Sequence, residues 1–497
     1  MKILLIEPSS ILPTDWSGVL KLFSPIGLGY LASMLEKNGH EVKILDARLE
    51  GYNQINKFND KLEYIGLTYK QIAKRVKKEN PQMVGIGGWS VQKFSIFRTA
   101  ESIKKLNPKV KIVLGGIMAS TDPKSCLSDT NVDFVIRGEG EYTIAELANE
   151  LEKKKPNFKK IKGLGYKINN ELFFNEMRKP IQNLDALPFP AYHLFDLKRY
   201  FETTQTPTDK RFKKIMNIVT SRGCPYNCCF CAVHTLTGVG WRPRSPENVV
   251  DEIELLVKKY GVNTIQFWDD NISVSKPRLI KILDLIKERK IDVQLDFSIF
   301  RADTLDDELF KKIKESNVGD YIYVSAESGD QEVLDKIVGK RLNLKYIIRA
   351  IKLAKKYGFK IGCHIVIGMP GETKKNIEQT YRFVQKIRKM GCGILCHVCI
   401  PFPSTRVYQQ CVENGYLTTK NELEYTVALL SDNAIIKTEE FSPEDLYRWR
   451  QKMEGNFEIK EITSTIIKNP VGSAKIFLAH PRHITKYILD KYVRRSH

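Results

Sequence analysis

Short apolar runs alternate with amphipathic stretches along the first 150 residues. Helical periodicity extends over Leu28–Asn38 and Lys93–Leu106. The apolar runs have the length of single strands: Lys2–Glu7, Glu41–Asp46, Met83–Gly87, Lys111–Gly115 and Phe134–Ile136. This alternation predicts an α/β unit, a doubly wound Rossmann-like parallel sheet with helices on both faces.

Small or turn-forming residues follow several of these strands. Ser9 and Ser10 follow the first strand, and glycine-bearing turns follow later ones at Gly87–Ser90, Gly115-Gly116 and Arg137–Glu141. Ligands of open parallel sheets bind beyond the carboxyl ends of the strands, where glycine lets a flat ligand approach the backbone. No G-x-G-x-x-G sequence follows the first strand, which argues against a dinucleotide site.

A second series of strands and helices begins after residue 210. Its predicted strands are Met216–Ser221, Thr264–Trp268, Val293–Phe297, Tyr321–Ser325, Lys360–Ile367 and Ile394–Phe402. Six parallel strands with helical crossovers predict a partial or complete (β/α) barrel, which carries its chemistry at the carboxyl ends of the strands.

These patterns divide the chain into four segments: a sheet domain (1–150), a linker (151–205), a barrel domain (206–414) and a small, mainly helical C-terminal region (415–497). The linker is polar and rich in lysine. It ends near Pro188 and Pro190, which favour an extended crossing between domains.

Composition fits a folded, soluble protein, with 42% hydrophobic and 28% charged residues among 497. No run approaches the ~18 consecutive apolar residues of a membrane span, and the apolar N-terminal run is too short for a signal peptide, so we expect a cytoplasmic protein. The net charge of +21 could suit nucleic acid or an anionic substrate. Solvated lysine-rich helix faces explain it as well, so a nucleic-acid partner is not expected.

Cysteines gather at one place in the chain. Cys224, Cys228, Cys229 and Cys231 fall within eight positions, which indicates metal or cluster chemistry in a reducing compartment. Cys224, Cys228 and Cys231 have C-x3-C-x2-C spacing in a loop after the first barrel strand. Three thiolates can hold three irons of a [4Fe–4S] cluster and leave the fourth iron open for a substrate or cofactor. A zinc site with His234 as its fourth ligand is the alternative.

Residues 210–410 resemble the radical S-adenosylmethionine (radical SAM) enzymes. Cys224, Cys228 and Cys231 match their cluster triad, and aromatic Phe230 stands before the last cysteine, as in the family. The resemblance implies that the open iron chelates S-adenosylmethionine, and that an electron from the cluster cleaves it to a 5′-deoxyadenosyl radical. It also implies an external electron donor of the ferredoxin or flavodoxin type.

Further motifs of the family follow the later strands in order. They include Trp268–Asn271, Arg301–Asp303, Glu327–Gly329 and Gly368–Glu372, while the closing Pro401–Thr405 has Ser404 where glycine is usual. The resemblance implies these contacts for S-adenosylmethionine: Phe230, Asp269, Asp270, Arg301, Glu327, Ser328, Gly368, Met369 and Pro370.

The N-terminal region resembles the cobalamin-binding domain that precedes one radical SAM class, class B. Ser24–Leu31, Val113–Gly116 and Val132–Glu141 carry this resemblance. The D-x-H-x-x-G motif is missing, and His40 is the only histidine before His193, so cobalt would have no protein imidazole. A relic sheet that binds no corrin is the alternative. The implied cobalamin contacts are Ser9, Ser10, Gly87, Gly88, Trp89, Gly115, Gly116, Gly138, Glu139 and Gly140.

Together the two resemblances imply a cobalamin-dependent C-methyltransferase acting on a small-molecule substrate. The deoxyadenosyl radical would take a hydrogen from an unactivated carbon, methylcobalamin would deliver the methyl group, and a second S-adenosylmethionine would remethylate cobalt. Class members also catalyse cyclisation or oxidation. Methylthiolation of transfer RNA needs three more N-terminal cysteines, where only Cys126 stands. The non-enzymatic alternatives are a cobalamin sensor and an electron carrier.

A second C-x3-C-x2-C sequence comprises Cys392, Cys396 and Cys399. It falls on the sixth predicted barrel strand, where alternation puts Cys396 on the opposite face from Cys399, so we expect no second cluster. His397 lies near the predicted barrel mouth. It is either a catalytic acid or base, or a packed histidine.

Overall fold

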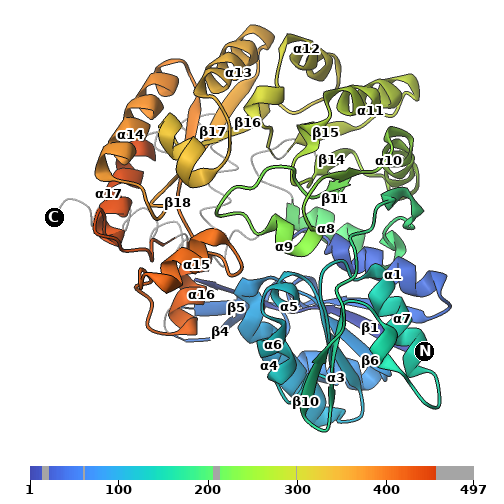
Figure 1. Cartoon of the computed structure of the whole chain (residues 1–497). Helices are drawn as coiled ribbons and strands as arrows, with labels where there is room; N and C mark the ends of the chain where they lie inside the picture. Colours follow the sequence, from blue (N-terminus) through green and yellow to red (C-terminus); the bar gives the residue numbers. More distant parts are fainter. Residues whose placement is uncertain (14–21, 60–61, 205–212, 298, 432, 455–497) are drawn as a thin grey trace.

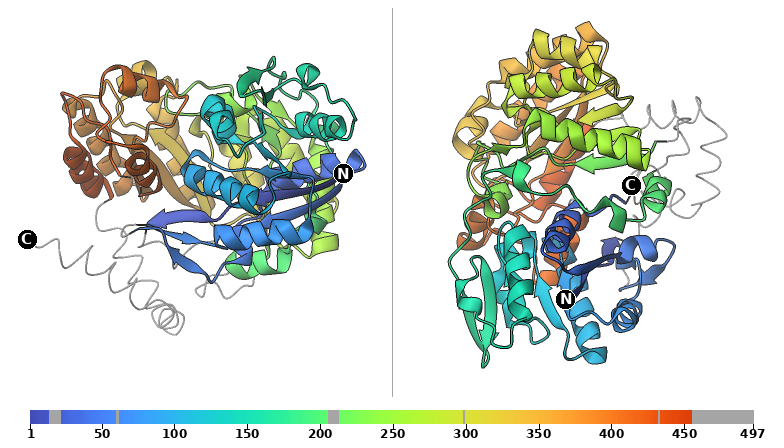
Figure 2. Two further views of the ribbon diagram at one scale, coloured as in Figure 1. Left: turned by 90° about the horizontal axis from the view of Figure 1, so that it is seen from below. Right: turned by 90° about the vertical axis from the view of Figure 1, so that its right-hand side faces the viewer.

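The computed structural model describes residues 1–13, 22–59, 62–204, 213–297, 299–431 and 433–454. Two α/β units lie one below the other in Figure 1, the N-terminal sheet beneath the barrel, and the views of Figure 2 show them packed together. The basic C-terminal end lies outside the described residues. Within the described residues, no helix is long and apolar enough to cross a membrane.

The N-terminal unit is built on a seven-stranded sheet in the order β10-β9-β8-β7-β6-β1-β3. Five strands are parallel, and they confirm the predicted doubly wound sheet to within one residue at each end: β1 (Lys2–Glu7), β3 (Glu41–Asp46), β6 (Met83–Ile86), β7 (Lys111–Leu114) and β8 (Phe134–Ile136).

Hydrophobic side chains of β1 alternate between two cores. Ile3 and Leu5 pack beneath α1 (Ile26–Lys37) and α7 (Glu141–Leu151). Leu4 and Ile6 pack on the other face, beneath α3 (Tyr69–Glu79) and α4 (Lys93–Leu106). Both faces of the sheet are therefore covered, and the carboxyl ends of its strands are left as the edge where a ligand can bind.

The segment expected as a linker contributes two strands to this sheet. β9 (Leu164–Ile168) and β10 (Glu171–Phe174) form a hairpin, and β9 pairs antiparallel with β8. Only the part after them crosses between the domains, through α8 (Leu197–Thr204). A separate three-stranded antiparallel sheet is formed by β2 (Ser10–Pro13), β4 (Ile55–Lys57) and β5 (Leu62–Ile65).

The second unit is the predicted partial (β/α)6 barrel. Its strands form two parallel sheets: β11 (Ile215–Ile218), β14 (Thr264–Phe267) and β15 (Gln294–Phe297), then β16 (Tyr321–Glu327), β17 (Lys360–Ile367) and β18 (Gly393–Val398). A bridge between Phe300 and Val324 joins the two sheets into one arc.

Helices cover the outer face of the arc: α10 (Pro246–Tyr260), α11 (Lys276–Glu288), α12 (Asp307–Glu315), α13 (Leu344–Tyr357) and α14 (Lys374–Lys389). From the C-terminal region, α17 (Pro443–Glu454) packs against β18 and α14 and so covers the last strand. α16 (Glu422–Ser431) contacts β2 of the N-terminal unit. The C-terminal region therefore completes the barrel and touches both units.

Candidate functional site

The cysteine loop runs from β12 (Ser221–Arg222) to α9 (Val233–Thr237), at the carboxyl end of the barrel. Gly223 begins it with φ of +84°, and a Cβ there would lie 2.4 Å from the carbonyl oxygen of Gly240. Only glycine fits this backbone. The Gly223 N–H donates to Asp270 Oδ2 at 2.9 Å, and His234 Nε2 lies 2.7 Å from the carbonyl oxygen of Cys224.

The three thiols of the triad lie within electrostatic reach of one another. Burial raises the pKa of Cys228 to about 11, and the nearby Glu327, Cys231 and Cys224 add to the effect. Among the described residues, no three Cys, His, Asp or Glu side chains converge on one point as a single metal ion requires. A [4Fe–4S] cluster binds each thiolate at a separate corner, and the three thiols of this loop can supply three of its four corners.

Cys229 points away from the triad. Its side chain is buried, and Sγ lies 3.9 Å from Met369 Sδ. Its backbone N–H donates to the carbonyl of Val338 at 2.9 Å. Burial raises the pKa of this thiol to about 12, so Cys229 stays protonated and packs in the core.

Arg301 supports the cysteine loop. Its guanidinium lies 3.5 Å from the centre of the Tyr226 ring, and its Nη2 donates to the carbonyls of Lys340 and Arg341. Asp269 has a similar role: its carboxylate accepts from Thr220 N, Thr220 Oγ1 and Ser221 Oγ. Both residues therefore support the base of the loop. They do so with the same guanidinium and carboxylate groups that would otherwise bind S-adenosylmethionine.

Glu327 ends β16 at an irregularity in the β16–β17 register and has φ of +65°. A non-glycine residue in the left-handed region is strained and persists only where its surroundings hold it. Glu327 Oε1 lies 2.7 Å from Lys340 Nζ, which also donates to Ser325 Oγ at 2.9 Å. Burial alone would raise the pKa of Glu327, but the Lys340 ammonium outweighs it and holds the pKa below its usual value.

Gly368 and Met369 form a turn around a buried carboxylate. Their backbone N–H groups both donate to Glu372 Oε2 at 2.7 Å, while Oε1 is buried without a hydrogen-bond partner among the described residues. Burial raises the pKa of Glu372 to about 7.

Ser328 nearby is bonded to Thr380 Oγ1 at 2.8 Å. The remaining residues of the expected set are Phe230, which is half-buried, and Pro370, which is buried.

The carboxyl edge of the N-terminal sheet is open. Trp89 is 61% exposed there, and a Cβ on Gly115 would meet no atom within 4 Å. Gly116 and Gly138 have φ of +86° and +75°. A large flat ring can therefore approach the backbone along this edge, which we call the glycine rim (Gly87–Trp89, Gly115-Gly116 and Gly138).

Two of the expected cobalamin contacts point elsewhere. Ser9 is buried, and its hydroxyl donates to the carbonyl of Leu67 at 2.6 Å. Glu139 accepts from the Ile181 N–H at 2.6 Å and from Arg222 and Arg242 at 3.0–3.1 Å. Its carboxylate is therefore already bonded to groups of the protein and does not face the rim as a free cobalamin contact. Ser10 begins β2, and Gly140 precedes α7.

A network of ion pairs connects the glycine rim to the cysteine loop. Arg222 precedes Gly223, and its Nη2 lies 2.5 Å from Glu141 Oε1 while Nη1 lies 3.1 Å from Glu139 Oε1. Side chains of Arg222, Arg242, Glu139 and Glu141 are all at least 87% buried. In addition, α5 (Ile117–Thr121), which follows the rim, packs against α9. No local sequence pattern indicates this contact between distant residues.

Comparison with known proteins identifies both units. Residues 218–384 match the model of the radical SAM superfamily, and residues 19–148 match the B12 binding domain. An uncharacterized methyltransferase of Pyrococcus horikoshii, PH0819, is 32% identical over 93% of both chains. The chain belongs to the cobalamin-dependent radical SAM methyltransferase family.

Two other similar proteins agree with this membership. The cytidylyl-2-hydroxyethylphosphonate methyltransferase of Streptomyces wedmorensis is 28% identical, over 85% of this chain and 84% of its own. The radical S-adenosylmethionine methyltransferase TsrM of Kitasatospora setae shares the fold, with a TM-score of 0.65 and 19% identity over 83% of this chain and 78% of that chain. Membership confirms the resemblance of both domains.

In this family member, His40 lies far from the glycine rim. It precedes β3, at the amino ends of the strands, whereas the rim is at their carboxyl ends. Its Nδ1 lies 3.2 Å from the N-terminal amino group, and its Nε2 lies 3.0 Å from Asn149 Oδ1. His40 therefore cannot reach a ring over the rim.

His397 forms a pair with His364 inside the barrel. Cys396 Sγ lies 3.6 Å from Met453 Sδ of α17, so Cys396 faces outward and His397, its neighbour along β18, faces the lumen. His364 lies on the same face of β17; its Nδ1 is 3.1 Å from His397 Nε2, and the rings are stacked. The face of His364 could not be assigned from the sequence.

The second cysteine triplet is divided among different surroundings. Cys396 packs against α17, while burial raises the pKa of Cys392 beside Cys363 and that of Cys399 beside Cys229. All three side chains are buried. They do not form a site for one cluster.

Proposed function

We propose that this enzyme transfers a methyl group to an unactivated carbon of a small-molecule substrate. One observation carries the proposal: Arg222, next to the cysteine loop, is ion-paired with Glu139 and Glu141 beside the glycine rim. A radical formed at one site and a methyl group held at the other must meet on the same substrate. The buried network holds the two sites at a fixed separation.

The chain's own residues would bind, orient and shield the reactants. Cys224, Cys228 and Cys231 would hold the [4Fe–4S] cluster, and the glycine rim would hold cobalamin, with His40 out of reach of the ring. When bound, the cluster supplies the electron that cleaves S-adenosylmethionine, and cobalamin supplies the methyl group. The backbone around Gly368 and the Glu327–Lys340 pair are placed to bind S-adenosylmethionine, the latter within electrostatic reach of Cys228.

His364 and His397 are proposed as the substrate-facing pair. Among the described residues, His364 Nε2 has no hydrogen-bond partner, and it lies on the lumen side of β17. Burial, with the neighbouring His397, lowers the pKa of His364, so its imidazole is neutral near pH 7 and can accept a hydrogen bond. The pair would orient a polar group of the substrate.

The proposal includes a reducing, cytoplasmic setting and an external one-electron donor of the ferredoxin or flavodoxin type. All ten cysteines are free, which supports a reducing compartment.

Mass spectrometry of anaerobic cell extracts, with and without the enzyme, tests the function. The expected result is a metabolite that gains one methyl mass, with formation of 5′-deoxyadenosine and S-adenosylhomocysteine. The Cys224→Ala enzyme should give none of these changes, and Cys229→Ala should give them all. A product that changes mass without gaining a methyl group would replace methylation by cyclisation or oxidation.

A further inference from the structure

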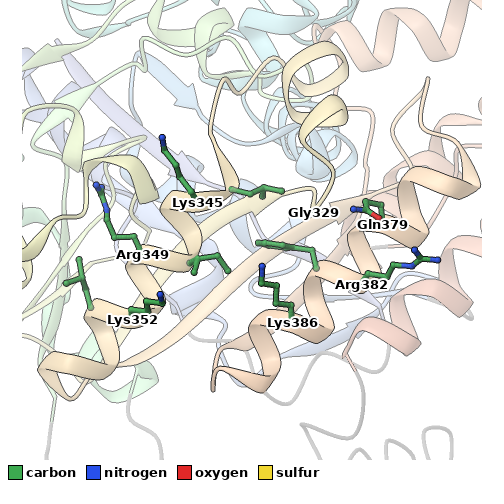
Figure 3. A pocket seen from close by; sticks show the side chains of 11 residues that line it. Gly329, Lys345, Arg349, Lys352, Gln379, Arg382 and Lys386 are labelled. Carbon is green, nitrogen blue, oxygen red and sulfur yellow. The ribbon is translucent and has the colours of Figure 1, made fainter.

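A groove with a cationic rim opens on the outer face of the barrel, between α13 and α14. Its volume is about 920 Å³. Figure 3 shows Lys345, Arg349 and Lys352 along one helix and Gln379, Arg382 and Lys386 along the other. None of the described lining residues is acidic. We call this surface the α13–α14 groove.

The floor of the groove is apolar. Leu344, Ile348, Leu353 and Phe383 line it and are only half-buried. An apolar centre with a polar rim is the usual anatomy of a transient protein interface, whereas nucleic-acid affinity comes mainly from cations on phosphates. The groove therefore fits a protein with an acidic rim and an apolar centre.

Three of its five cations form no ion pair with any residue that the structure describes, and one of these, Lys345, has its Nζ 5.2 Å from the centre of the Tyr346 ring. Within the described part of the chain, Lys345, Lys352 and Lys386 have no ion-pair partner, and their side chains are exposed. Arg382 pairs with Glu378 at 2.8 Å, and Arg349 donates to the carbonyl of Asp303. Free lysines on a groove concentrate positive potential, which steers an acidic partner towards it.

The groove and the cysteine loop share one wall, residues 329–345. Gly329, Leu344 and Lys345 line the groove. Between them, the carbonyl of Val338 accepts from Cys229 N at 2.9 Å, and a Cβ on Gly339 would lie 3.3 Å from the carbonyl of Asn227. A protein seated in the groove would thus lie one chain segment away from the loop that carries the cluster ligands.

We propose that the α13–α14 groove docks the acidic electron-donor protein. The inference rests on the proposed function, because cleavage of S-adenosylmethionine consumes one electron that no residue of the chain supplies. The docked donor is oxidised by one electron and the cluster is reduced by one electron; no bond is made or broken between the two proteins. Charge attraction brings the donor to the groove, and residues 329–345 connect the groove to the cysteine loop.

The test compares two electron sources on the full-length, reconstituted enzyme. Reduced flavodoxin is the protein donor, and dithionite is a small donor that needs no docking surface. The variant is Lys345→Glu/Lys352→Glu/Lys386→Glu. The control reverses three exposed lysines on α3 of the N-terminal unit, Lys70→Glu/Lys74→Glu/Lys77→Glu, and leaves the same net charge.

The groove variant should keep the dithionite-driven rate of 5′-deoxyadenosine formation and lose roughly tenfold or more of the flavodoxin-driven rate, because rim charges govern association. The dissociation constant of flavodoxin, measured directly at low salt, should rise by a similar factor. Raising the salt concentration should slow the flavodoxin-driven rate of the wild type but not that of the variant. The α3 control should match the wild type throughout.

Flavodoxin binding as tight in the groove variant as in the α3 control would overturn the proposal. So would a groove variant that loses affinity for a single-stranded RNA oligonucleotide while keeping its flavodoxin-driven rate. The binding measurement does not depend on turnover. A wild-type enzyme that forms no 5′-deoxyadenosine with dithionite would therefore refute the proposed function and not the docking surface.

Discussion

The cysteine loop and the glycine rim are both proposed ligand sites at the carboxyl ends of parallel strands, but the chain holds them differently. Around the loop, backbone groups are already bonded: Gly223 N to Asp270, Cys229 N to Val338 and the Asn227 carbonyl to Arg406. At the rim, Trp89 is exposed and Gly115 faces open space. The chain thus fixes the cysteine loop through its own hydrogen bonds and leaves the glycine rim exposed.

The largest expected effect comes from removing cluster ligands. Cys224→Ala, Cys228→Ala and Cys231→Ala should each reduce the iron content of the reconstituted protein from about four irons per chain to near none. Cys229→Ala is the matched control, because its thiol packs against Met369. Iron and sulfide analysis measures the outcome. Equal iron loss from Cys229→Ala would show that the ligand set is wrong.

A bulky residue at the rim should remove cobalamin and leave the cluster. Gly115→Leu is the preferred variant, because the new side chain would point into open space without a clash and the backbone at Gly115 does not have a positive φ. Gly116→Leu is less clean, because φ is +86° and its Cβ would lie 3.1 Å from the Gly88 carbonyl.

Gly115→Leu should weaken cobalamin binding roughly tenfold or more, about 1.4 kcal/mol or above. The absorbance of bound corrin after gel filtration measures the loss, with iron content as the internal control. Gly319→Leu is the control in the loop before β16, where a Cβ would meet only ordinary contacts at 3.9 Å, and it should bind cobalamin normally. If Gly115→Leu also retained the corrin, the ring would not lie over the rim.

Breaking the network between the two sites should destabilise the enzyme. Arg222→Met leaves Glu141 buried without its cation, while Glu139 keeps Arg242; the unpaired buried charge costs about 3–5 kcal/mol. Arg98→Met removes an exposed pair with Glu101 and should cost less than about 1 kcal/mol. Urea unfolding measures both. Equal stability of the two variants would mean that the network does not hold the two sites together.

The last effect concerns Glu372 and appears only as a dependence of stability on pH. Burial raises its folded pKa to about 7 from 4.5, so the folded state binds more protons than the unfolded state between these values. Its contribution to stability is therefore full below pH 4.5 and falls as pH rises towards 7. Glu372→Gln should remove this slope. The free energy of unfolding of the variant apoprotein, relative to that of the wild type, should be about 3 kcal/mol higher at pH 8 than at pH 4. Thermal unfolding at both pH values measures it; a difference between variant and wild type that did not change with pH would contradict the assignment.

The periodic parts of the molecule could be predicted from sequence. Strand length and helical spacing located the five parallel strands of the first sheet and the six of the barrel, because strands covered by helices must present apolar side chains to them. The triad followed from spacing within one loop. β9 and β10 were missed, since Lys-rich, polar surroundings hid a short hairpin at the sheet edge.

Contacts between distant residues could not be predicted. Glu327 was expected from its motif, but its partner Lys340 stands in a segment with no motif. Arg222 and Glu139 are 83 residues apart in the chain, and nothing in the sequence around either residue predicts that they form an ion pair. Arg301 and Asp269 matched family positions, yet in the structure they brace the loop. Which motif residues support a site, and which face a ligand, depends on packing.

One measurement tests the central claim without knowledge of the substrate. The reconstituted enzyme, with cobalamin and a reductant, is incubated anaerobically with S-adenosylmethionine whose methyl group carries deuterium. The account predicts that the bound cobalamin acquires the deuterated methyl group with release of S-adenosylhomocysteine, and that the same protein forms 5′-deoxyadenosine. Formation of 5′-deoxyadenosine with no label on cobalamin would contradict methyl transfer through cobalt.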